Sequence, residues 1–322
     1  MKHLQKCIYR CSLIALLMLG SFSILKAEAP MVKSQVSGYY RMMLGQFEIT
    51  TLYDGYTGID VKQLHNGPES KIQELLNRQF VPTPKMPTSV NAFLINTGSK
   101  LVLIDSGAGK VFGPTLGNVI QNLKASGYKP SQVDMVLITH MHGDHIGGLL
   151  DSSGKPAFPN ATIWTAKAES NYWLSTDIAK KAPAEMQSHF KLARDISGPC
   201  KAAGKWKTFE NGFEPVPGIK AVSSPGHTPG HTVYEITSDG QTLVAIGDTV
   251  HSVAVQFAAP TISCDFDTDQ TQAIASRLAL FKNITTRNTL VAGAHLPFPG
   301  IGRLHIDGEN TYTCVPVIYS PL

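Results

Sequence analysis

The sequence predicts an α/β protein in which two β-sheets pack together, with helices on their outer faces. Two observations carry this prediction. Apolar runs of strand length recur in both halves of the 322-residue chain, and stretches with helical spacing alternate with them. A hydrophobic fraction of 43% and a charged fraction of 16% are typical of a globular protein, so disordered and fibrous classes are excluded.

The first 29 residues are expected to be a signal peptide. Three basic residues fall within the first ten positions, the segment 12–25 is apolar, and Ala27-Glu28-Ala29 offers small residues suited to cleavage. An uncleaved membrane anchor is the alternative, and the shortness of the apolar segment disfavours it. We therefore expect an exported protein, periplasmic or secreted, whose residues 30–322 form a single domain. Its only membrane association would be through the export signal.

Charge and cysteine content narrow the function classes further. The chain carries a formal charge of +4, and its first 29 residues contribute four basic side chains against one acidic one, a net +3. Removing that +3 leaves about +1, so the net charge does not indicate a nucleic-acid partner. Three cysteines follow the signal peptide, so at most one intramolecular disulfide can form, and the sequence does not indicate which pair: Cys200, Cys264 or Cys314.

In the first half of the chain, two hairpins, a helix and a buried strand are expected in that order. The first hairpin turns at Gly45-Gln46 and the second at Thr97-Gly98-Ser99, and the helix ends at Gly127. The last strand is a dense apolar run, as in a sheet that is buried on both faces. The predicted hairpin strands are 40–44 with 47–52 and 90–96 with 100–104, followed by a helix at 116–125 and a strand at 133–139.

The second half alternates strands and helices in the same manner. Residues 30–37 and the Pro/Gly-rich tail after Leu296 are expected to be irregular. The predicted strands are 161–165, 219–223, 232–236, 241–246 and 289–294, and the predicted helices are 166–175, 184–195 and 270–281.

The stretch 139–150, THMHGDHIGGLL, concentrates three histidines and an aspartate within six positions. It follows an apolar strand, and alternate side chains of an extended chain point the same way, so His140 and His142 are expected to converge. Asp144 and His145 follow as the chain turns toward a second position. Two imidazoles on one side, with a carboxylate and a third imidazole on the other, suit two neighbouring cations. A histidine-rich surface loop is the alternative, and the spacing disfavours it.

Further candidate ligands lie where later apolar runs stop, the position at which sheet proteins build sites. His227 and His231 lie in SPGHTPGHT, Asp248 lies in AIGDT, and His295 lies in AGAHLPFPG. The remaining histidines after the signal peptide lack this context and are expected on the surface or in local hydrogen bonds: His65, His189, His251 and His305.

The run His140-Met141-His142-Gly143-Asp144-His145, with the later histidines and aspartate, resembles the metallo-β-lactamase superfamily. The segment Ile104-Asp105-Ser106-Gly107 is similar to that family's upstream DSG-type segment, whose aspartate supports the metal loop. The resemblance implies an α/β fold of the four-layer αββα sandwich type, with the metal site at one edge between the two sheets.

A closer resemblance covers nearly the whole chain after the signal peptide. Segments such as GYYRMMLGQFEITTLYDG, THMHGDHIGG, GHTPGHT and FPGIG resemble the exported methyl parathion hydrolases and their lactonase relatives. The resemblance implies two divalent metal ions, with zinc as the best match to the donors and manganese, iron or cobalt as alternatives. One ion would be held by His140, His142 and His227, the other by Asp144, His145 and His295, with Asp248 bridging them and His231 in a supporting role.

The chemistry expected of such a site is hydrolysis by a hydroxide held between two cations. Asp248 would position this nucleophile, and Asp144 would manage the proton. By the same resemblance, three aromatic residues would form an apolar mouth to the pocket, with the segment 61–70 close to it. They are Phe112, Trp173 and Phe190.

An apolar mouth favours uncharged hydrophobic lactones or esters, such as acyl-homoserine lactones or aryl esters, as the small-molecule partner. Hydrolysis of organophosphate triesters is the alternative, and a β-lactamase or a glyoxalase-type thioester hydrolase is a weaker one. A binding protein without activity would be expected to have lost a ligand, and none is missing. Members of the group often form dimers, so a homodimer to which the segment 31–54 contributes is also expected.

Overall fold

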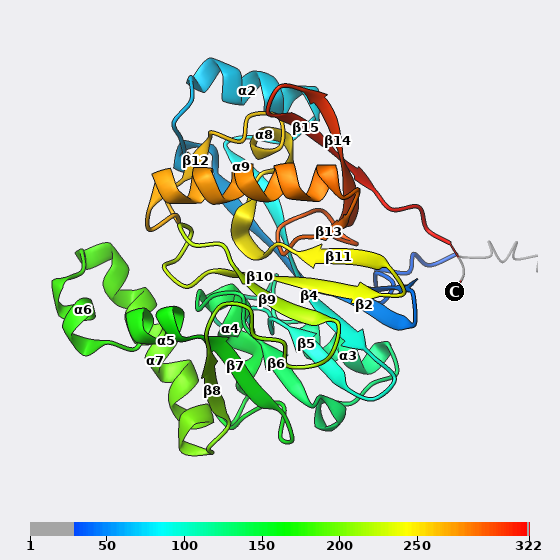
Figure 1. Cartoon of the computed structure of the whole chain (residues 1–322), viewed down its shortest axis with the longest axis vertical. Coiled ribbons are helices and arrows are strands. Elements are labelled where there is room, and N and C mark those ends of the chain that lie inside the picture. The colour runs from blue at the N-terminus through cyan, green and yellow to red at the C-terminus, as the bar shows by residue number, and fades with distance from the viewer. Residues whose placement is uncertain (1–28, 321) are drawn as a thin grey trace, which may run out of the picture. The chain divides into compact units, whose positions relative to one another are not determined.

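The computed structural model describes residues 29–320 and residue 322 (Figure 1). It divides into two units, residues 1–36 and 37–322, and the fold described below is that of the second unit. The predicted signal peptide lies outside the described residues, apart from its last residue, Ala29. Residues 30–37 form neither helix nor strand, as expected. Among the described residues, no helix combines the length and the apolar character that a membrane crossing requires.

The first sheet has seven strands. In spatial order, the first four strands pair antiparallel with one another, as in hairpins. The fourth strand pairs parallel with the fifth, and the remaining pairs up to the seventh strand are also parallel. In that order they are β1 (Tyr39–Leu44), β2 (Phe47–Asp60), β4 (Lys85–Asn96), β5 (Leu101–Ile104), β6 (Met135–Leu137), β7 (Thr162–Ala166) and β8 (Trp206–Phe209).

The second sheet has six strands, and all its pairs are antiparallel except β11 with β13. In spatial order they are β15 (Thr311–Pro316), β14 (Ile301–Gly308), β13 (Leu290–Ala292), β11 (Gln241–Ala245), β10 (Thr232–Ser238) and β9 (Ile219–Ser223). A small separate sheet pairs β3 (Leu64–His65) with β12 (Ser263–Cys264).

Helices accompany both sheets, and α9 lies on the opposite side of the strands from α5 and α7 (Figure 1). The α-helices of the described residues are α2 (Glu69–Arg78), α3 (Val119–Ala125), α4 (Gly143–Ile146), α5 (Lys167–Trp173), α6 (Thr176–Lys181), α7 (Gln187–Ala202), α8 (Val253–Gln256) and α9 (Gln270–Thr286).

The buried side chains show that the layers are helix, sheet, sheet, helix. Along β4, Leu94 packs with the residues of α3 and α7, whereas Phe93 and Ile95 pack against strands of the second sheet. This division follows from the alternation of side chains along a strand. Beyond the second sheet, Val233 of β10 packs with Phe281 of α9. The predicted four-layer αββα sandwich is therefore confirmed.

Both predicted hairpins and most later elements are confirmed, with shifted ends. The helix expected from residue 116 begins at Val119, and β2 continues to Asp60, eight residues past its predicted end. The prediction of an irregular tail after Leu296 is wrong, because β14 and β15 form there. β14 buries Ile301 and Gly302 but exposes most of its other residues, so it lacks the apolar run that marks the central strands.

Candidate metal centre

The metal loop, residues 139–145, follows β6 and includes most of α4. Asp105 holds it in place through hydrogen bonds. The Thr139 backbone N–H donates to Asp105 Oδ1 at 2.8 Å, and the Thr139 hydroxyl donates to Oδ2 at 2.8 Å. Asp105 Oδ2 also lies 2.8 Å from His145 Nδ1. Because this nitrogen is engaged by a carboxylate, His145 directs its Nε2 into the centre. The supporting role that the resemblance implied for Asp105 agrees with these contacts.

The second sheet supplies the other candidate ligands. His227 follows β9, Asp248 lies in the turn after β11, and His295 follows β13. The carboxyl ends of β11 and β13 lie at the same edge of the sheet because these strands are parallel. The sandwich thus brings the ends of four strands, β6 from one sheet and β9, β11 and β13 from the other, to one place.

The seven predicted ligands form two groups, and in each group the ligand atoms lie within 4.8 Å of one another. A third such group in the described residues joins His227 to His251 and Cys264. In the first group, which we call the three-histidine group, His227 Nε2 lies 3.2 Å from His140 Nε2 and 3.0 Å from His142 Nδ1. Its fourth member is Asp248.

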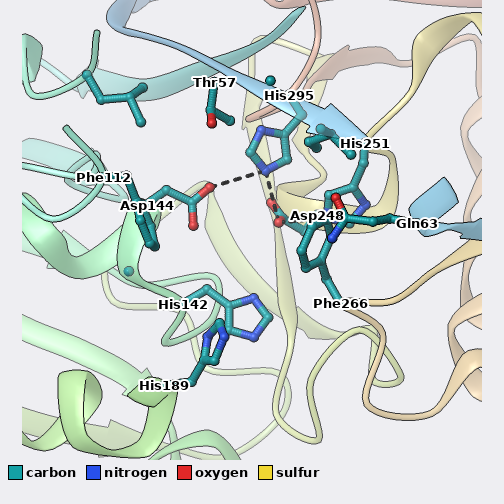
Figure 2. Close-up of a pocket in the computed structure, with 14 residues that line it drawn as sticks. Thr57, Gln63, Phe112, His142, Asp144, His189, Asp248, His251, Phe266 and His295 are labelled. Atoms are coloured by element: carbon teal, nitrogen blue, oxygen red, sulfur yellow. Dashed lines mark hydrogen bonds and ion pairs between the residues drawn. The ribbon is translucent and has the colours of Figure 1, made fainter. Parts of the chain in front are cut away.

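The second group, which we call the mixed group, contains Asp144, His145, His295 and the shared Asp248. His295 Nε2 lies 3.5 Å from Asp144 Oδ2 and 3.0 Å from Asp248 Oδ2 (Figure 2). His145 Nε2 lies 3.0 Å from Asp248 Oδ1. The structure therefore brings together all seven residues that were predicted as metal ligands.

Two buried atoms at the centre support a cation between them. His145 Nε2 and Asp248 Oδ1 are 3.0 Å apart, yet neither has a hydrogen-bond partner. A buried polar atom without a partner costs about 1–3 kcal/mol. A cation that accepts both lone pairs would remove this cost, and five imidazoles with two carboxylates form a donor set that suits zinc and other divalent transition metals. The residues present thus fit a pair of divalent ions.

The electrostatics agree with this fit for His140, His142 and Asp248. Burial, followed by the nearby histidines, holds the pKa of both His140 and His142 well below the ordinary value, so these rings are neutral donors. Burial acts to raise the pKa of Asp248, but His145 and the other surrounding histidines hold it well below the ordinary value. Neutral imidazole and ionised carboxylate are the forms that bind metal. Burial acts to lower the pKa of His145 and His295, but Asp248 and the other nearby carboxylates raise it, so a cation bound there would displace protons.

A cavity of about 190 Å³ opens onto the centre (Figure 2). Its polar wall includes candidate ligands of both groups, and none of its lining residues is a lysine or an arginine. Its apolar wall consists of Ile59, Phe112, Leu116 and Phe266, and Gln63 places the segment 61–70 at the cavity, as expected.

The three predicted mouth aromatics lie in two different environments. Phe112 lines the cavity and is 46% exposed. Trp173 and Phe190 have no exposed surface and belong to the core beneath the first sheet, so the structure does not place them in the cavity lining. Trp173 acts on the site indirectly, because its ring contacts the edge of His142 at a centroid distance of 5.3 Å.

His251 was expected on the surface or in a local hydrogen bond; it makes the local contact, to Asp248, but it is buried at the centre and not on the surface. It is 4% exposed, lines the cavity, and its Nε2 lies 3.0 Å from Asp248 Oδ2. Its position three residues after Asp248, on the same turn, is the sequence signal that could have identified it. His189 also lines the cavity, whereas His305 is exposed as expected.

His231 has the supporting role that was expected of it. Its Nδ1 lies 3.0 Å from the Ser224 carbonyl oxygen, and its Nε2 accepts the backbone N–H of Asp248 at 3.0 Å. Both ring nitrogens are therefore engaged, and burial lowers the pKa of His231 to about 3. His227 Nδ1, by comparison, lies 3.0 Å from Asp267 Oδ1, a carboxylate that the sequence did not single out.

Comparison with known proteins places this geometry in a family. Residues 86–295 match the metallo-beta-lactamase superfamily, which is about two thirds of the chain. The crystal structure of hydrolase AbOPH in the beta lactamase superfamily is 38% identical, with a TM-score of 0.85 over 89% of this chain and 100% of that one.

Two lactonases are also similar. AidC, a dizinc quorum-quenching lactonase in complex with the product N-hexanoyl-L-homoserine, is 26% identical, with a TM-score of 0.81 over 89% of this chain and 100% of that one. An N-acyl homoserine lactonase from a Bacillus species is 25% identical over 211 residues, 58% of this chain and 75% of that one. The chain spans 44% and 42% of the length of two further curated relatives.

The fold and the clustered histidines and aspartates define a hydrolase that depends on metal. The chain belongs to the metallo-beta-lactamase superfamily.

Proposed function

We propose that the protein uses two divalent metal ions, zinc in the first instance, to hydrolyse uncharged hydrophobic lactones or esters. The observation that carries this proposal is the cavity: a polar wall of candidate ligands faces an apolar wall, and none of the described residues that line it is a lysine or an arginine. A cavity without a lysine or arginine offers no cationic side chain to pair with an anionic group of the substrate that lies away from the metal ions. This argues against β-lactams and glutathione thioesters, which carry carboxylates.

When bound, the two cations would supply an activated water at neutral pH and polarise the carbonyl of the substrate. Asp248 lies between the two groups, with Oδ1 3.0 Å from His145 Nε2 and Oδ2 3.4 Å from His227 Nε2. It is buried and would join the two halves of the site.

Asp144 is suited to transfer a proton to the leaving oxygen of the substrate. It lines the cavity, and 18% of its side chain is exposed, compared with 3% for Asp248. A carboxylate that reaches both the centre and the cavity can carry a proton to the leaving oxygen. The apolar wall, including Phe112 and Phe266, would hold the acyl or aryl part of the substrate and exclude water.

The test is a set of initial rates for the zinc-loaded protein on an acyl-homoserine lactone, an aryl ester and a methyl phosphotriester. The comparison variants are Asp248→Ala and the exposed His305→Ala, which serves as the matched control. We expect fast turnover of the lactone or the ester, lost in Asp248→Ala and retained in His305→Ala. A phosphotriester rate well above the other two would favour the organophosphate alternative, and no turnover of any substrate by a protein with two bound metals would reject the substrate class.

We also propose export of the chain, on the basis of its basic start and the apolar segment 12–25. Cell fractionation of the expressing bacterium, with N-terminal sequencing of the product, tests this. A full-length product in the cytoplasmic fraction would contradict it.

A further inference from the structure

Glu169, in the first turn of α5, is a fully buried carboxylate outside the cavity, with none of its surface exposed. It accepts four hydrogen bonds, and all four donors come from the protein. Burying an ionisable group is costly unless it is paired or fully hydrogen-bonded, so a carboxylate with this environment has a specific structural task.

The two oxygens of Glu169 reach two different loops. Oε1 accepts the backbone N–H of Met141 at 2.8 Å, and Met141 stands between His140 and His142. Oε2 accepts the Thr228 hydroxyl at 2.8 Å and the Gly230 N–H at 2.9 Å, in the loop that carries His227. One carboxylate thus ties together the two segments that supply the whole set of imidazoles in the three-histidine group.

The loop that carries His227 approaches α5 closely because residue 230 is a glycine. A Cβ atom at Gly230 would lie 2.2 Å from the backbone nitrogen of Glu169 and 2.5 Å from its Cβ, so only glycine allows this contact. The fourth donor, Trp173 Nε1, lies on α5 itself, 2.7 Å from Oε1, and its ring packs against that of His142.

The mixed group is supported by different residues. Asp105 holds His145 through Nδ1 at 2.8 Å, and the Ser89 carbonyl oxygen lies 2.8 Å from His295 Nδ1. None of these contacts passes through Glu169. The ties of Glu169 thus reach only the segments of the three-histidine group, whereas Asp105 holds His145 and also the start of the metal loop, through Thr139.

We propose that Glu169 is a positioning residue that sets the three-histidine group for its divalent cation, and that its loss weakens this group selectively. The inference rests on the proposed two-metal function. Glutamine at this position keeps the shape of the side chain, but its NH₂ group would face a donor in one of the loops, so one tie is lost and its donor is left unpaired.

The test compares zinc stoichiometry and the two zinc affinities, measured by competition with a chromophoric chelator, in wild type and Glu169→Gln. Wild type should hold two zinc ions per chain. In Glu169→Gln we expect one affinity to fall about 10- to 100-fold while the other is unchanged, the size of effect known for residues that orient metal ligands. Addition of His295→Ala to Glu169→Gln should remove the remaining tight ion, which identifies it as the one in the mixed group.

Two further variants separate positioning from general damage. Cys200→Ala shortens a buried side chain of α7 that makes no hydrogen bond to Glu169 or to either loop, and it should keep both affinities. Thr228→Val removes one of the two ties to the His227 loop and should lower the same affinity as Glu169→Gln by a smaller factor. If Glu169→Gln does not fold, the zinc affinities of Thr228→Val still test the positioning role of Glu169.

Equal loss of both affinities, or two wild-type affinities in Glu169→Gln and Thr228→Val, would overturn the inference. A wild-type protein that binds no zinc would instead reject the proposed two-metal function, so the two failures are distinguishable.

Discussion

His227 and His231 lie four residues apart in one loop and are equally buried, yet they face different partners. His227 Nε2 points at His140 and His142, whereas both ring nitrogens of His231 are engaged by the protein, one of them by the Asp248 backbone. The difference in partners predicts a difference in function between two histidines that look alike in the sequence.

His227→Ala is expected to lose one zinc ion and the hydrolytic activity. His231→Ala should keep two zinc ions but lose about 1–3 kcal/mol in free energy of unfolding, because a buried N–H of Asp248 is left without an acceptor. Elemental analysis together with urea unfolding checks both statements. Two retained ions in His227→Ala, or none in His231→Ala, would reverse the assignment.

Cys200 is fully buried in α7, and its thiol should make the stability of the protein depend on pH in the alkaline range. All three cysteines within the described residues are free thiols, and burial raises the pKa of Cys200 from 9.0 to about 11. Between these two values the folded chain keeps the thiol proton and the unfolded chain releases it, so stability falls as pH rises. The free energy of unfolding should fall by about 1.4 kcal/mol per pH unit at most.

Urea unfolding of wild type and Cys200→Ala at pH 8, 9, 10 and 10.5 tests this. At pH 8 the free energy of unfolding of Cys200→Ala should be lower than that of wild type, because a core side chain is shortened. As pH rises, the free energy of unfolding of the variant should then fall less steeply than that of wild type. Since burial also raises the pKa of Cys314 to about 11, some alkaline slope should persist in the variant. Parallel curves for the two proteins would contradict the role of Cys200.

At the scale of elements, the segment after α4 packs directly on the loop that follows β5. A Cβ atom at Gly148 would lie 2.0 Å from the Ser106 carbonyl oxygen. Gly148→Ala should therefore destabilise the protein by about 1–3 kcal/mol and displace α4, which carries Asp144 and His145. Gly198, in α7, is the matched control because a Cβ atom there meets nothing within 4 Å.

Gly198→Ala should leave zinc binding unchanged and stabilise the helix by up to about 1 kcal/mol. Thermal unfolding and zinc titration of the two variants provide the comparison. A Gly148→Ala protein as stable as wild type would show that the two segments can separate without cost.

The wall of the cavity gives a further prediction at this scale. Phe112, in the loop between β5 and α3, should contact the apolar part of a substrate, whereas Phe190 lies in the core. Phe112→Ala should raise KM for a long-chain lactone about fivefold to tenfold, equivalent to about 1 kcal/mol of lost apolar contact, with little change in Tm. Phe190→Leu should lower Tm and leave KM nearly unchanged, and the reverse pattern would place Phe190 at the substrate.

These elements also show how far the sequence can be used for prediction. Strand ends followed by histidine or aspartate are local signals, and they indicated the candidate ligands together with His231; the family resemblance then favoured His227 over His231. Glu169 could not be identified in this way. Glu169 meets its partners across 28 and 59–61 positions of sequence, and only the packing of two loops on α5 creates its environment. β14, which lies next to the edge strand β15 and whose residues are mostly exposed, also lacks an apolar pattern strong enough to predict a strand.

At the scale of the whole molecule, the seven candidate ligands come from both sheets. His140, His142, Asp144 and His145 follow β6 of the first sheet, and the others follow strands of the second. A cation in either group therefore joins the two halves of the sandwich at one edge. Without cations the same edge holds crowded imidazoles and a pair of buried atoms that lack partners. Metal binding should consequently stabilise the entire fold and not only the cavity.

Removal of the metal with a chelator, followed by thermal unfolding with and without added zinc, tests this. An ion present at 100 times its Kd stabilises the folded state by about 2.7 kcal/mol, so two ions should contribute about 5 kcal/mol. For a domain of this size each kcal/mol shifts Tm by about 2–4 °C, and a rise of about 10–20 °C is expected. His140→Ala and His295→Ala, one from each group, should each retain about half of the rise. An equal Tm with and without zinc would mean that the two sheets are held together without the ions.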